Sequence, residues 1–342
     1  RSFKLFLPRM RDFDNEIFIS SFMKNIYVTV VSYEYALMAI SIVRALASQQ
    51  KECAIYCIDD RAADLLEDLN LKSCMIFRPK DYTNDKLSYI RKNRSDSEFC
   101  WTCKSVALEH VLTQIDGLDW VIYLDSDMMI YGDPDQGLPD DTTSQVMLTP
   151  HRPSNNHFKS FMAKAGDYNA GYIAFRNSSE GRRALKWWRN KCELSCSVSA
   201  DNQEYADQRY LNDIPELFSG VYISDHMGVN AAPWNIIGKR ISCVDGAIFV
   251  NDQPLLIYHM QGFKKIRNGI YDLYCGEQKI PNIIRNTIYI PYVCHLEKTE
   301  NMLPAYYQQS VDKKLSLLFR VIIRELKRMI FGVSNLYRYS RC

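Results

Sequence analysis

Two carboxylates that could bind a divalent cation follow an apolar run in the first half of the chain. Residues 120–124 (WVIYL) predict a short strand buried on both faces, and Asp125 and Asp127 come directly after it. A carboxylate at the end of a buried strand needs a counter-charge. Carboxylate oxygens are also the ligands by which proteins hold Mg²⁺ or Mn²⁺ against phosphate groups. The pair therefore predicts a cation site for a phosphate-bearing ligand, although solvated surface turns also produce Asp-x-Asp.

Phosphatases with a nucleophilic aspartate also carry Asp-x-Asp after a strand, and the sequence resembles them in part. Their motif continues with Thr or Val two residues after the second Asp and lies on the first strand. Here Met129 fills that position and three predicted strands come before the motif. These two differences disfavour the phosphatase alternative.

The elements that must position these carboxylates alternate between strand and helix. Apolar runs predict strands at 26–31, 53–58, 74–77 and 120–124, and helical spacing predicts helices at 36–47, 61–69 and 101–115. Shorter strands are predicted at 146–149, 172–175, 221–224 and 255–258, with helices near 180–191 and 204–211. This alternation predicts an α/β fold with a parallel sheet covered by helices on both faces. Ligands bind beyond the carboxyl ends of such strands, where Ser32–Tyr35, Asp59-Asp60 and Asp125–Asp127 fall.

Four further motifs occur in the second half of the chain. They are Tyr168-Asn169-Ala170-Gly171-Tyr172, Asp207-Gln208 followed by Leu211-Asn212, Asn230 before Pro233-Trp234-Asn235, and the His-x-x-Gly-x-x-Lys motif His259–Lys265. Together with Asp-x-Asp, and in this order, they make residues 26–265 resemble the family 8 glycosyltransferases. That group includes glycogenin and bacterial lipopolysaccharide galactosyltransferases.

The resemblance implies a GT-A fold, in which a Rossmann-like nucleotide-binding half with a mixed, mostly parallel sheet joins an acceptor-binding half. It implies a metal-dependent, retaining transfer of sugar from a nucleotide-diphosphate donor, UDP-linked, to a glycan or lipid-linked glycan acceptor in cell-surface polysaccharide or lipopolysaccharide synthesis. Mn²⁺ or Mg²⁺ would bind Asp125, Asp127 and His259, with Gly262 and Lys265 at the diphosphate. A cation and an ammonium stabilise negative charge that develops on the leaving group.

The resemblance also implies roles around the donor. Thr29, Ser32 and Tyr35 would line the nucleotide base, Lys104 and Ser126 would lie near the nucleotide sugar, and Asn230, Trp234 and Asn235 would form the donor and acceptor wall. Asn169 and Asp207 would contact the donor sugar, and Gln208 would lie near the anomeric carbon, so that Asp207 and Gln208 are the expected catalytic residues. An amide oxygen carries no full charge and is a poor nucleophile, which favours front-side displacement over a covalent route.

Several of these assignments have alternatives. Tyr33 competes with Tyr35 and Lys264 with Lys265, Lys104 could be an ordinary solvent-facing lysine, and Trp234 and His259 could serve packing alone. The family's Pro-Trp after the His-x-x-Gly-x-x-Lys motif is replaced here by Ile266-Arg267. That departure leaves the packing and closure of the loop open.

Composition and charge place limits on the class of protein. The 342 residues are 47% hydrophobic and 24% charged, as in a globular chain. Residues 311–342 carry a net charge of +6 and the rest of the chain −4, so broad nucleic-acid binding is not expected. The first 25 residues lack the apolar core of a signal peptide. We divide the chain into an N-terminal extension (1–25), a GT-A domain (26–295) and a basic tail (296–342).

The basic tail contains an amphipathic pattern between Leu315 and Ile330. Apolar residues recur at helical spacing, and Arg320, Arg324, Lys327 and Arg328 fall on the opposite face. Such a helix can lie on an anionic membrane surface, or it can pack on the domain or on a partner subunit. The eleven cysteines lack zinc-site spacing and indicate reduced thiols. We therefore expect a cytoplasmic protein, peripheral on the cytoplasmic face of a membrane.

Two other functions remain as alternatives to a transferase. A sugar-1-phosphate nucleotidyltransferase has a similar sheet, but it usually carries a Gly-rich phosphate loop after the first strand, and Ser32-Tyr33-Glu34-Tyr35 contains no glycine. A catalytically silent glycan- or membrane-binding protein would be expected to have lost metal ligands, whereas Asp125, Asp127 and His259 are all present.

Overall fold

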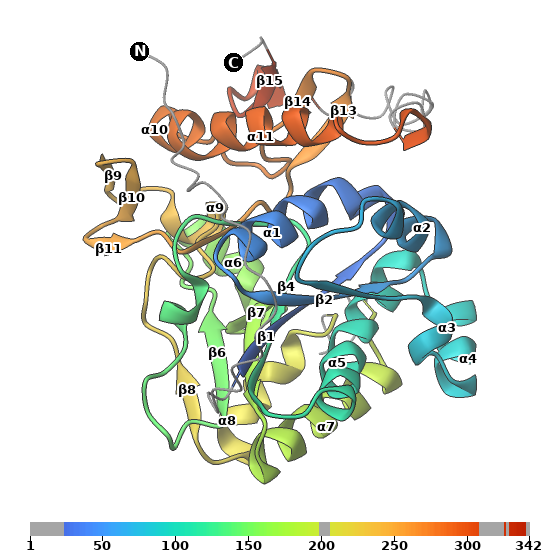
Figure 1. Cartoon of the computed structure of the whole chain (residues 1–342). Coiled ribbons are helices and arrows are strands. Elements are labelled where there is room, and N and C mark those ends of the chain that lie inside the picture. The colour runs from blue at the N-terminus through green and yellow to red at the C-terminus, as the bar shows by residue number, and fades with distance from the viewer. Residues whose placement is uncertain (1–23, 198–205, 308–324, 326–327, 340–342) are drawn as a thin grey trace.

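A mixed sheet forms the centre of the protein (Figure 1). The computed structural model describes residues 24–197, 206–307, 325 and 328–339. In this part of the chain seven strands form the sheet, in the order β3 (Cys74–Phe77), β2 (Glu52–Cys57), β1 (Lys24–Val31), β4 (Leu118–Leu124), β7 (Tyr168–Arg176), β6 (Val146–Pro150) and β8 (Val221–Ile223). Only β7 runs antiparallel to its neighbours. The sheet is therefore mixed and mostly parallel, as predicted.

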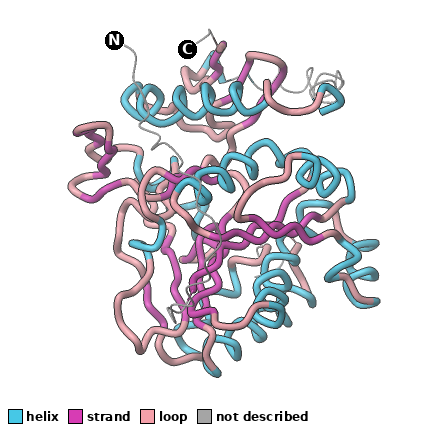
Figure 2. The backbone as a smooth tube through the Cα atoms, in the orientation of Figure 1, coloured by secondary structure: helices cyan, strands magenta, loops and turns pink. Residues whose placement is uncertain are grey.

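Helices cover both faces of the sheet, as the alternation of elements predicted (Figure 2). Helices α1 (Ala36–Ser48) and α2 (Asp60–Asp68) pack on one face, and α5 (Asp96–Gln114) and α7 (Ser179–Leu194) pack on the other. Strand β1 contributes to both cores because successive side chains point to opposite faces. Tyr27 and Val31 belong to the first core, and Val28 and Val30 belong to the second.

Side-chain caps fix where α2 and α5 begin. Asp59 accepts a hydrogen bond from the Ala62 amide at the start of α2. Ser95 and Glu98 form a capping box at the start of α5. Each cap satisfies backbone N–H groups that have no partner inside the helix. The caps hold the first turn of each helix near the carboxyl end of the sheet.

Smaller elements complete the described chain. They are η1 (Tyr33–Tyr35), α3 (Pro79–Tyr82), α4 (Asp85–Asn93), β5 (Met128–Ile130), η2 (Pro134–Gly137), α6 (Asn156–Ala165), η3 (Arg209–Asp213), α8 (Ile214–Leu217), α9 (Pro233–Ile236), β9 (Ile241–Val244), β10 (Ala247–Val250), β11 (Gln253–Pro254), β12 (Ile257–His259), β13 (Lys264–Arg267), β14 (Ile270–Asp272), α10 (Asn282–Ile284), η4 (Arg285–Tyr289), α11 (Ile290–Glu300) and β15 (Leu336–Arg338). Strands β5 and β12 pair antiparallel, and β13, β14 and β15 form a separate sheet. Helix α11 packs over α1 (Figure 1).

The predicted helix at 204–211 is wrong in its described part. Residues 198–205 lie outside the described residues, and the chain resumes as a turn that leads into the short 3-10 helix η3. Ala206 has a φ of 54°, and a left-handed backbone conformation cannot continue a right-handed helix. The turn leaves Asp207 and Gln208 on an irregular segment instead of on one helix face.

The predicted amphipathic helix at 315–330 lies mostly outside the described residues, including Arg320, Arg324 and Lys327. Arg328 is described, and its expected place on an exposed basic face is wrong. Its side chain is buried, and its guanidinium lies 2.7 Å from Asp272 on β14 and also bonds Glu325. The cation is inside because the Asp272 carboxylate is itself fully buried and needs an opposite charge.

The predicted division at residues 25 and 295 stays a prediction. Residues 1–23 lie outside the described part, and helix α11 runs across residue 295.

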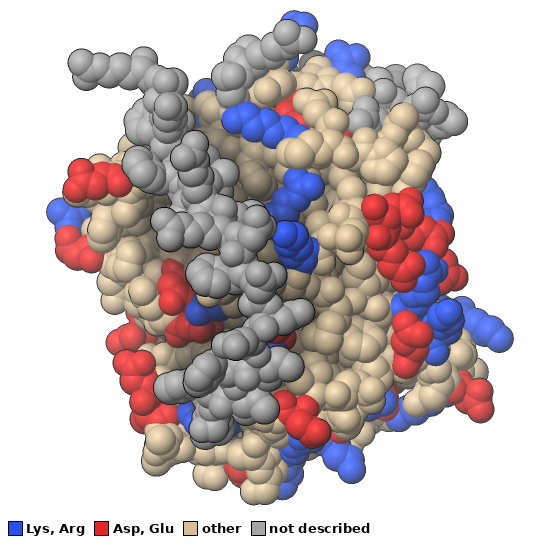
Figure 3. Space-filling view, viewed as in Figure 1, with Lys and Arg blue, Asp and Glu red and all other residues tan. Residues whose placement is uncertain are grey.

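Among the described residues, no helix combines the length and apolarity needed to cross a bilayer. On the face seen in Figure 3, acidic and basic side chains lie interspersed. Among the described cysteines, nine are free thiols and Cys294 is disulfide-bonded, so the expectation of reduced thiols is wrong for Cys294.

We expect Arg328→Ala to lower the free energy of unfolding by about 3 to 5 kcal/mol, because it leaves the Asp272 carboxylate buried without this cation. Urea denaturation followed by circular dichroism would measure the change. Arg338→Ala removes an exposed arginine from β15 and should change stability by less than about 0.5 kcal/mol. Equal, small effects of the two substitutions would contradict the structural role of Arg328.

Candidate active site

The pairing of two short strands brings the predicted metal ligands together. Strand β5 begins one residue after Asp127, and β12 ends at His259. The two strands pair antiparallel with His259 opposite Met128, and the Met260 amide donates to the Asp127 carbonyl at 2.8 Å. The Asp125 amide donates in turn to the Gly171 carbonyl of β7. These backbone bonds set the imidazole beside the two carboxylates.

The three side chains form one possible cation-binding group, with one ligand atom from each lying within 4.8 Å of the others. His259 Nε2 is 3.1 Å from Asp127 Oδ1 and 3.8 Å from Asp125 Oδ2. An octahedral Mg²⁺-sized cation has ligands at about 2.1 Å, which puts neighbouring ligands about 3 Å apart. Imidazole and carboxylate also form a donor set that suits Mn²⁺. The residues therefore fit the predicted cation, whose identity the donor set alone does not fix.

Lys104 supplies the counter-charge that the carboxylates require. It comes from α5, is 4% exposed, and its Nζ lies 2.8 Å from Asp125 Oδ1. The same Nζ is 3.2 Å from Asp207 Oδ2, an ion pair without hydrogen-bond geometry. Burial lowers the pKa of Lys104, but attraction to Asp125 and Asp207 outweighs it and raises the pKa above its ordinary value. The alternative of a solvent-facing lysine is wrong.

The charges of this group are set by burial and by each other. Burial raises the pKa of Asp207 despite the nearby ammonium of Lys104. Burial also raises the pKa of Asp127, but the imidazole of His259 outweighs it and lowers that pKa. For His259, burial lowers the pKa, and attraction to Asp127 and Asp125 reverses the shift. Each strongly buried ionisable group thus lies against an opposite charge.

A cavity of about 550 Å³ opens beside these residues at the carboxyl ends of β1, β2 and β4. This is the edge at which open α/β sheets bind ligands, and the volume is in the range of small-molecule sites. Most of the predicted site residues line it: Ser32, Tyr35, Lys104, Asp125, Ser126, Asp127, Asn169, Asp207, Gln208, Trp234 and His259. The fold therefore gathers, on the wall of one cavity, predicted site residues that are up to 227 positions apart in the chain.

Tyr33 and Tyr35 both line the cavity, but their rings are in different surroundings. The Arg61 guanidinium lies 3.9 Å from the centre of the Tyr33 ring, and Tyr307 packs edge-on against the same ring. Tyr35 is 42% exposed. A ring open to the cavity is free to stack on a base, so the geometry favours Tyr35 over Tyr33 for that role.

Three residues that were predicted to contact the nucleotide-sugar donor lie away from the cavity wall. Thr29 is buried in β1, and its hydroxyl has no hydrogen-bond partner among the described residues. Asn235 is buried at the start of α9, where its Oδ1 accepts from the Ala232 amide. Asn230 is buried behind His259 and bonds to its ring. Their roles in binding a donor stay predictions.

The loop after His259 turns Lys265 away from the cavity. Gly262 has a φ of 79°, and a side chain there would come within 3.1 Å of Tyr274, so the turn requires glycine. Lys265 lies on β13 and forms an ion pair with Glu300 of α11. Gln261, which the sequence did not single out, lines the cavity instead. Lys264 is exposed on β13.

Other lining residues were missed at the sequence level. Arg61 lies three residues after the predicted strand 53–58, and His151 lies two residues after the predicted strand 146–149. The edge rule that selected Asp125 would have selected them too. Arg91 and Trp101 also line the cavity, but they lie on helices α4 and α5, where no local motif marks them.

His151 is a buried neutral histidine at this edge. It is 2% exposed, its Nδ1 lies 2.8 Å from the Gly166 carbonyl, and its Nε2 lies 3.3 Å from Asn169 Nδ2. Burial lowers the pKa of His151 to about 4. The carbonyl oxygen requires a proton on Nδ1, so Nε2 is left as the acceptor.

Comparison with known proteins supports the fold. No family model matches the chain. The uncharacterized proteins YfnD and YfnF of Bacillus subtilis (strain 168) are similar to it: YfnD is 28% identical over 277 residues, 80% of this chain and 88% of YfnD. YfnF is 29% identical over 250 residues, 71% of this chain and 82% of YfnF. Among solved structures, the galactosyltransferase LgtC with donor and acceptor sugar analogues aligns with a TM-score of 0.50 and 15% identity over 83% of this chain and 99% of that one. The predicted glycosyltransferase-type fold is confirmed.

We expect the lowered pKa of His151 to make the free energy of unfolding decrease as the pH is lowered from about 6.5 to 4. The unfolded chain binds a proton near pH 6.5 and the native state near pH 4, so this stabilisation is full above pH 6.5 and is lost as the pH falls toward 4. The loss is on the order of 3 kcal/mol. Urea denaturation between pH 7 and pH 4 should give a flatter profile for His151→Asn. The control His157→Asn, an exposed histidine, should keep the wild-type profile, and an unchanged slope in His151→Asn would contradict the assignment.

Proposed function

We propose that the protein is a metal-dependent, retaining glycosyltransferase. It takes a sugar from a nucleotide-diphosphate donor, UDP-linked, and transfers it to a glycan or lipid-linked glycan in cell-surface polysaccharide or lipopolysaccharide synthesis. The observation that carries the proposal is the gathering of Asp125, Asp127 and His259 within 4.8 Å on the wall of a 550 Å³ cavity. The glycosyltransferase-type fold supports the same reaction class.

Mn²⁺ or Mg²⁺ is the proposed cofactor, held by Asp125, Asp127 and His259. A bound divalent cation stabilises the negative charge that develops on a leaving diphosphate. Lys104 lies against Asp125 on the side away from His259, since its ammonium pairs with Oδ1 while Oδ2 faces His259. The cavity wall carries two more described cations, Arg61 and Arg91, which suit a phosphate-bearing donor. Tyr35, Ser32 and Ser126 are the proposed neighbours of the nucleotide.

Gln208 supports a front-side displacement. Its Oε1 accepts a hydrogen bond from Asn169 Nδ2 at 3.2 Å, so the one oxygen that could attack the anomeric carbon is already engaged. The amide N–H₂ group is then the part of Gln208 that can donate to the donor sugar or to its departing oxygen. Asp207, beside the Lys104 ammonium, is the proposed acceptor for a sugar hydroxyl.

Lys265 requires a movement to reach the diphosphate. Its ammonium forms an ion pair with Glu300 of α11. To bring Lys265 to the cavity, residues 261–265 would have to rotate about Gly262, whose φ is already positive. The donor therefore competes with Glu300 for this cation. Lys104, Arg61 and Arg91 line the cavity without any such movement.

A second cavity of about 330 Å³ supports a neighbouring acceptor site. It shares Met162, Trp234 and Gln261 with the first cavity, and Phe158 and Tyr274 add aromatic surface. Aromatic rings pack against the apolar faces of sugars, so a glycan end could rest there while its hydroxyl enters the first cavity. The acceptor would approach past Trp234.

The proposed location is the cytoplasmic face of a membrane, with the basic tail on anionic lipid. The supporting observation in the described residues is the exposure of three consecutive apolar side chains, Met329, Ile330 and Phe331, which are 60%, 81% and 78% exposed. Exposed apolar residues next to a basic segment favour the boundary of lipid headgroups.

Thermal-shift measurements with UDP-, GDP-, CMP- and dTDP-sugars, each with and without Mn²⁺, test the proposal. We expect UDP-sugars to raise the melting temperature only when Mn²⁺ is present, because binding to the native state stabilises it by mass action. Asp127→Asn and His259→Ala should abolish the Mn²⁺-dependent part of the shift. The control Asp140→Asn, an exposed aspartate, should leave it intact. Shifts that do not depend on metal, or survive both substitutions, would refute the metal-site assignment.

Hydrolysis of the stabilising UDP-sugar, followed by NMR, tests the stereochemistry. The first-formed sugar should keep the anomeric configuration of the donor. Gln208→Ala should lower the initial rate by roughly 100-fold, the loss of one hydrogen-bond donor in a transition state, with little change in donor Kd. The exposed control Gln136→Ala should match the wild type. Inverted product would exclude the retaining mechanism.

A further inference from the structure

A chain of buried side-chain hydrogen bonds runs behind the cavity, and a backbone group fixes its direction. The Gly171 N–H donates to Asn169 Oδ1 at 2.9 Å. A backbone N–H can only donate, so this contact identifies the oxygen of the Asn169 amide without ambiguity. The amino group of Asn169 must therefore lie on the other side, where it donates to His151 Nε2 and Gln208 Oε1 at 3.3 and 3.2 Å.

The orientation of the Asn169 amide also determines the orientation of the Asn230 amide. Its Nδ2 lies 2.9 Å from Asn169 Oδ1 and 2.9 Å from Thr149 Oγ1. Because Asn169 Oδ1 can only accept, the Asn230 atom that faces it must be the amino nitrogen. Asn230 Oδ1 then faces His259 Nδ1 at 3.2 Å. An oxygen acceptor opposite a ring nitrogen requires that nitrogen to carry a proton.

The far end of the chain gives the same direction independently. His151 Nδ1 lies 2.8 Å from the Gly166 carbonyl, which can only accept. His151 Nδ1 is therefore protonated and its Nε2 accepts, as the Asn169 amino group requires. Two backbone groups on different segments thus agree on the orientation of every amide and ring between Gly166 and His259.

The backbone at Asn230 is also special. Its φ is 52°, and its carbonyl accepts from Asn235 Nδ2 at 3.1 Å. Asparagine is among the few side chains that adopt this left-handed conformation readily. Trp234 packs edge-on against the His259 ring with the ring centres 5.3 Å apart. The imidazole is therefore held by a hydrogen bond to Nδ1 and by an aromatic contact, with Nε2 directed toward Asp127 and Asp125.

We propose that Asn230 is the positioning residue of the metal centre, where it accepts from His259 Nδ1–H and so keeps Nε2 as the atom offered to the cation. This role differs from the contact with the donor that the resemblance to family 8 implied for Asn230. The inference rests on the proposed function only for the presence of a cation at Asp125, Asp127 and His259. It needs no particular donor or acceptor.

Mn²⁺ binding to the protein without nucleotide, measured by calorimetry and pulsed EPR, tests the proposal. Loss of an outer hydrogen-bond partner of a ligating histidine typically weakens metal affinity 10- to 100-fold. Asn230→Gly removes the acceptor while tolerating the positive φ, so we expect a 10- to 100-fold higher Kd and altered nitrogen couplings from the imidazole. Asn230→Asp keeps an oxygen opposite Nδ1 but sets its second oxygen against Asn169 Oδ1, so it should bind Mn²⁺ more tightly than Asn230→Gly.

A matched control separates positioning from general destabilisation. Asn251→Gly makes the same substitution at another left-handed asparagine, in the turn between β10 and β11, and should leave the Kd for Mn²⁺ unchanged. Asn230→Ser, whose hydroxyl is too short to reach His259, is the second variant if Asn230→Gly does not fold, with the same expected weakening.

Wild-type affinity in Asn230→Gly or Asn230→Ser would overturn the inference alone, as would a Kd for Asn230→Asp as weak as that of Asn230→Gly. Failure of the wild type itself to bind Mn²⁺ or Mg²⁺ would overturn both the inference and the metal-dependent function. The two failures are therefore distinguishable in one set of titrations.

Discussion

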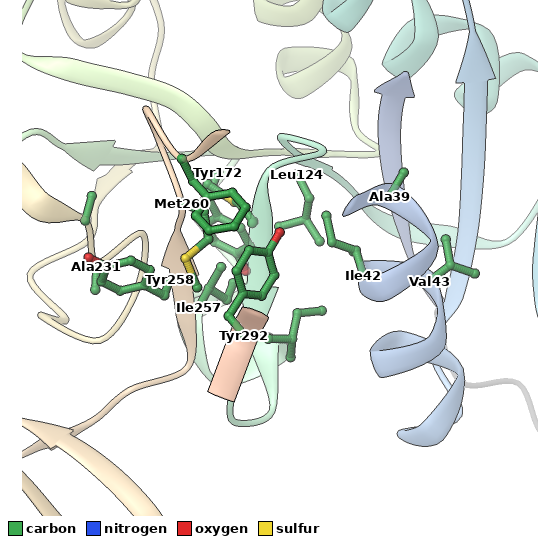
Figure 4. Packing of buried hydrophobic residues seen from close by; sticks show 14 of the residues in the cluster. Ala39, Ile42, Val43, Leu124, Tyr172, Ala231, Ile257, Tyr258, Met260 and Tyr292 are labelled. Atoms are coloured by element: carbon green, nitrogen blue, oxygen red, sulfur yellow. The ribbon is translucent and has the colours of Figure 1, made fainter. Parts of the chain in front are cut away.

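The pairing of β5 with β12 is the interaction on which the candidate site depends. It sets His259 opposite Met128, one residue beyond Asp127, and so joins parts of the chain that lie about 130 residues apart. The apolar residues on each side of the ligands hold this pairing in place. Leu124 precedes Asp125, and Tyr258 and Met260 flank His259, and all three belong to one buried core with Ile42 of α1 and Tyr292 of α11 (Figure 4). Apolar packing thus fixes the spacing of the charged groups.

Several charged side chains lie close together at the site, and apolar packing alone would not stabilise them there. Three acidic groups and one imidazole meet around a single buried ammonium, that of Lys104. This arrangement leaves a surplus of negative charge, which a divalent cation would neutralise. The polar chain from His151 to His259 adds hydrogen bonds without adding charge. It can therefore orient the imidazole and Gln208 without changing the net charge of the site.

The sequence was sufficient for the strands of the central sheet and for the residue types at its carboxyl edge, but not for the segment around 204–211. Continuous apolar runs such as 26–31 predict buried parallel strands, and the rule that ligands bind at strand ends located Ser32 and Asp125. It failed where the direction of a side chain depends on a distant segment. Lys265 turns to Glu300, and Arg328 turns inward to Asp272, because carboxylates on other elements hold them. Asn230 was expected to contact the donor, and its hydrogen bond to the His259 ring could not be read from the sequence because the two residues lie on separate segments.

The order in which the ligands lie along the chain has a consequence for biosynthesis. Asp125 and Asp127 leave the ribosome about 130 residues before His259, which at 5–20 residues per second corresponds to roughly 7 to 26 s. Strands β1 to β4 and helix α5 precede this interval, so the nascent chain can already place Lys104 beside Asp125. Strand β5 must wait for β12, and its backbone edge stays open for pairing with other segments. The three ligands can therefore meet only after β12 has been synthesised and has docked on β5.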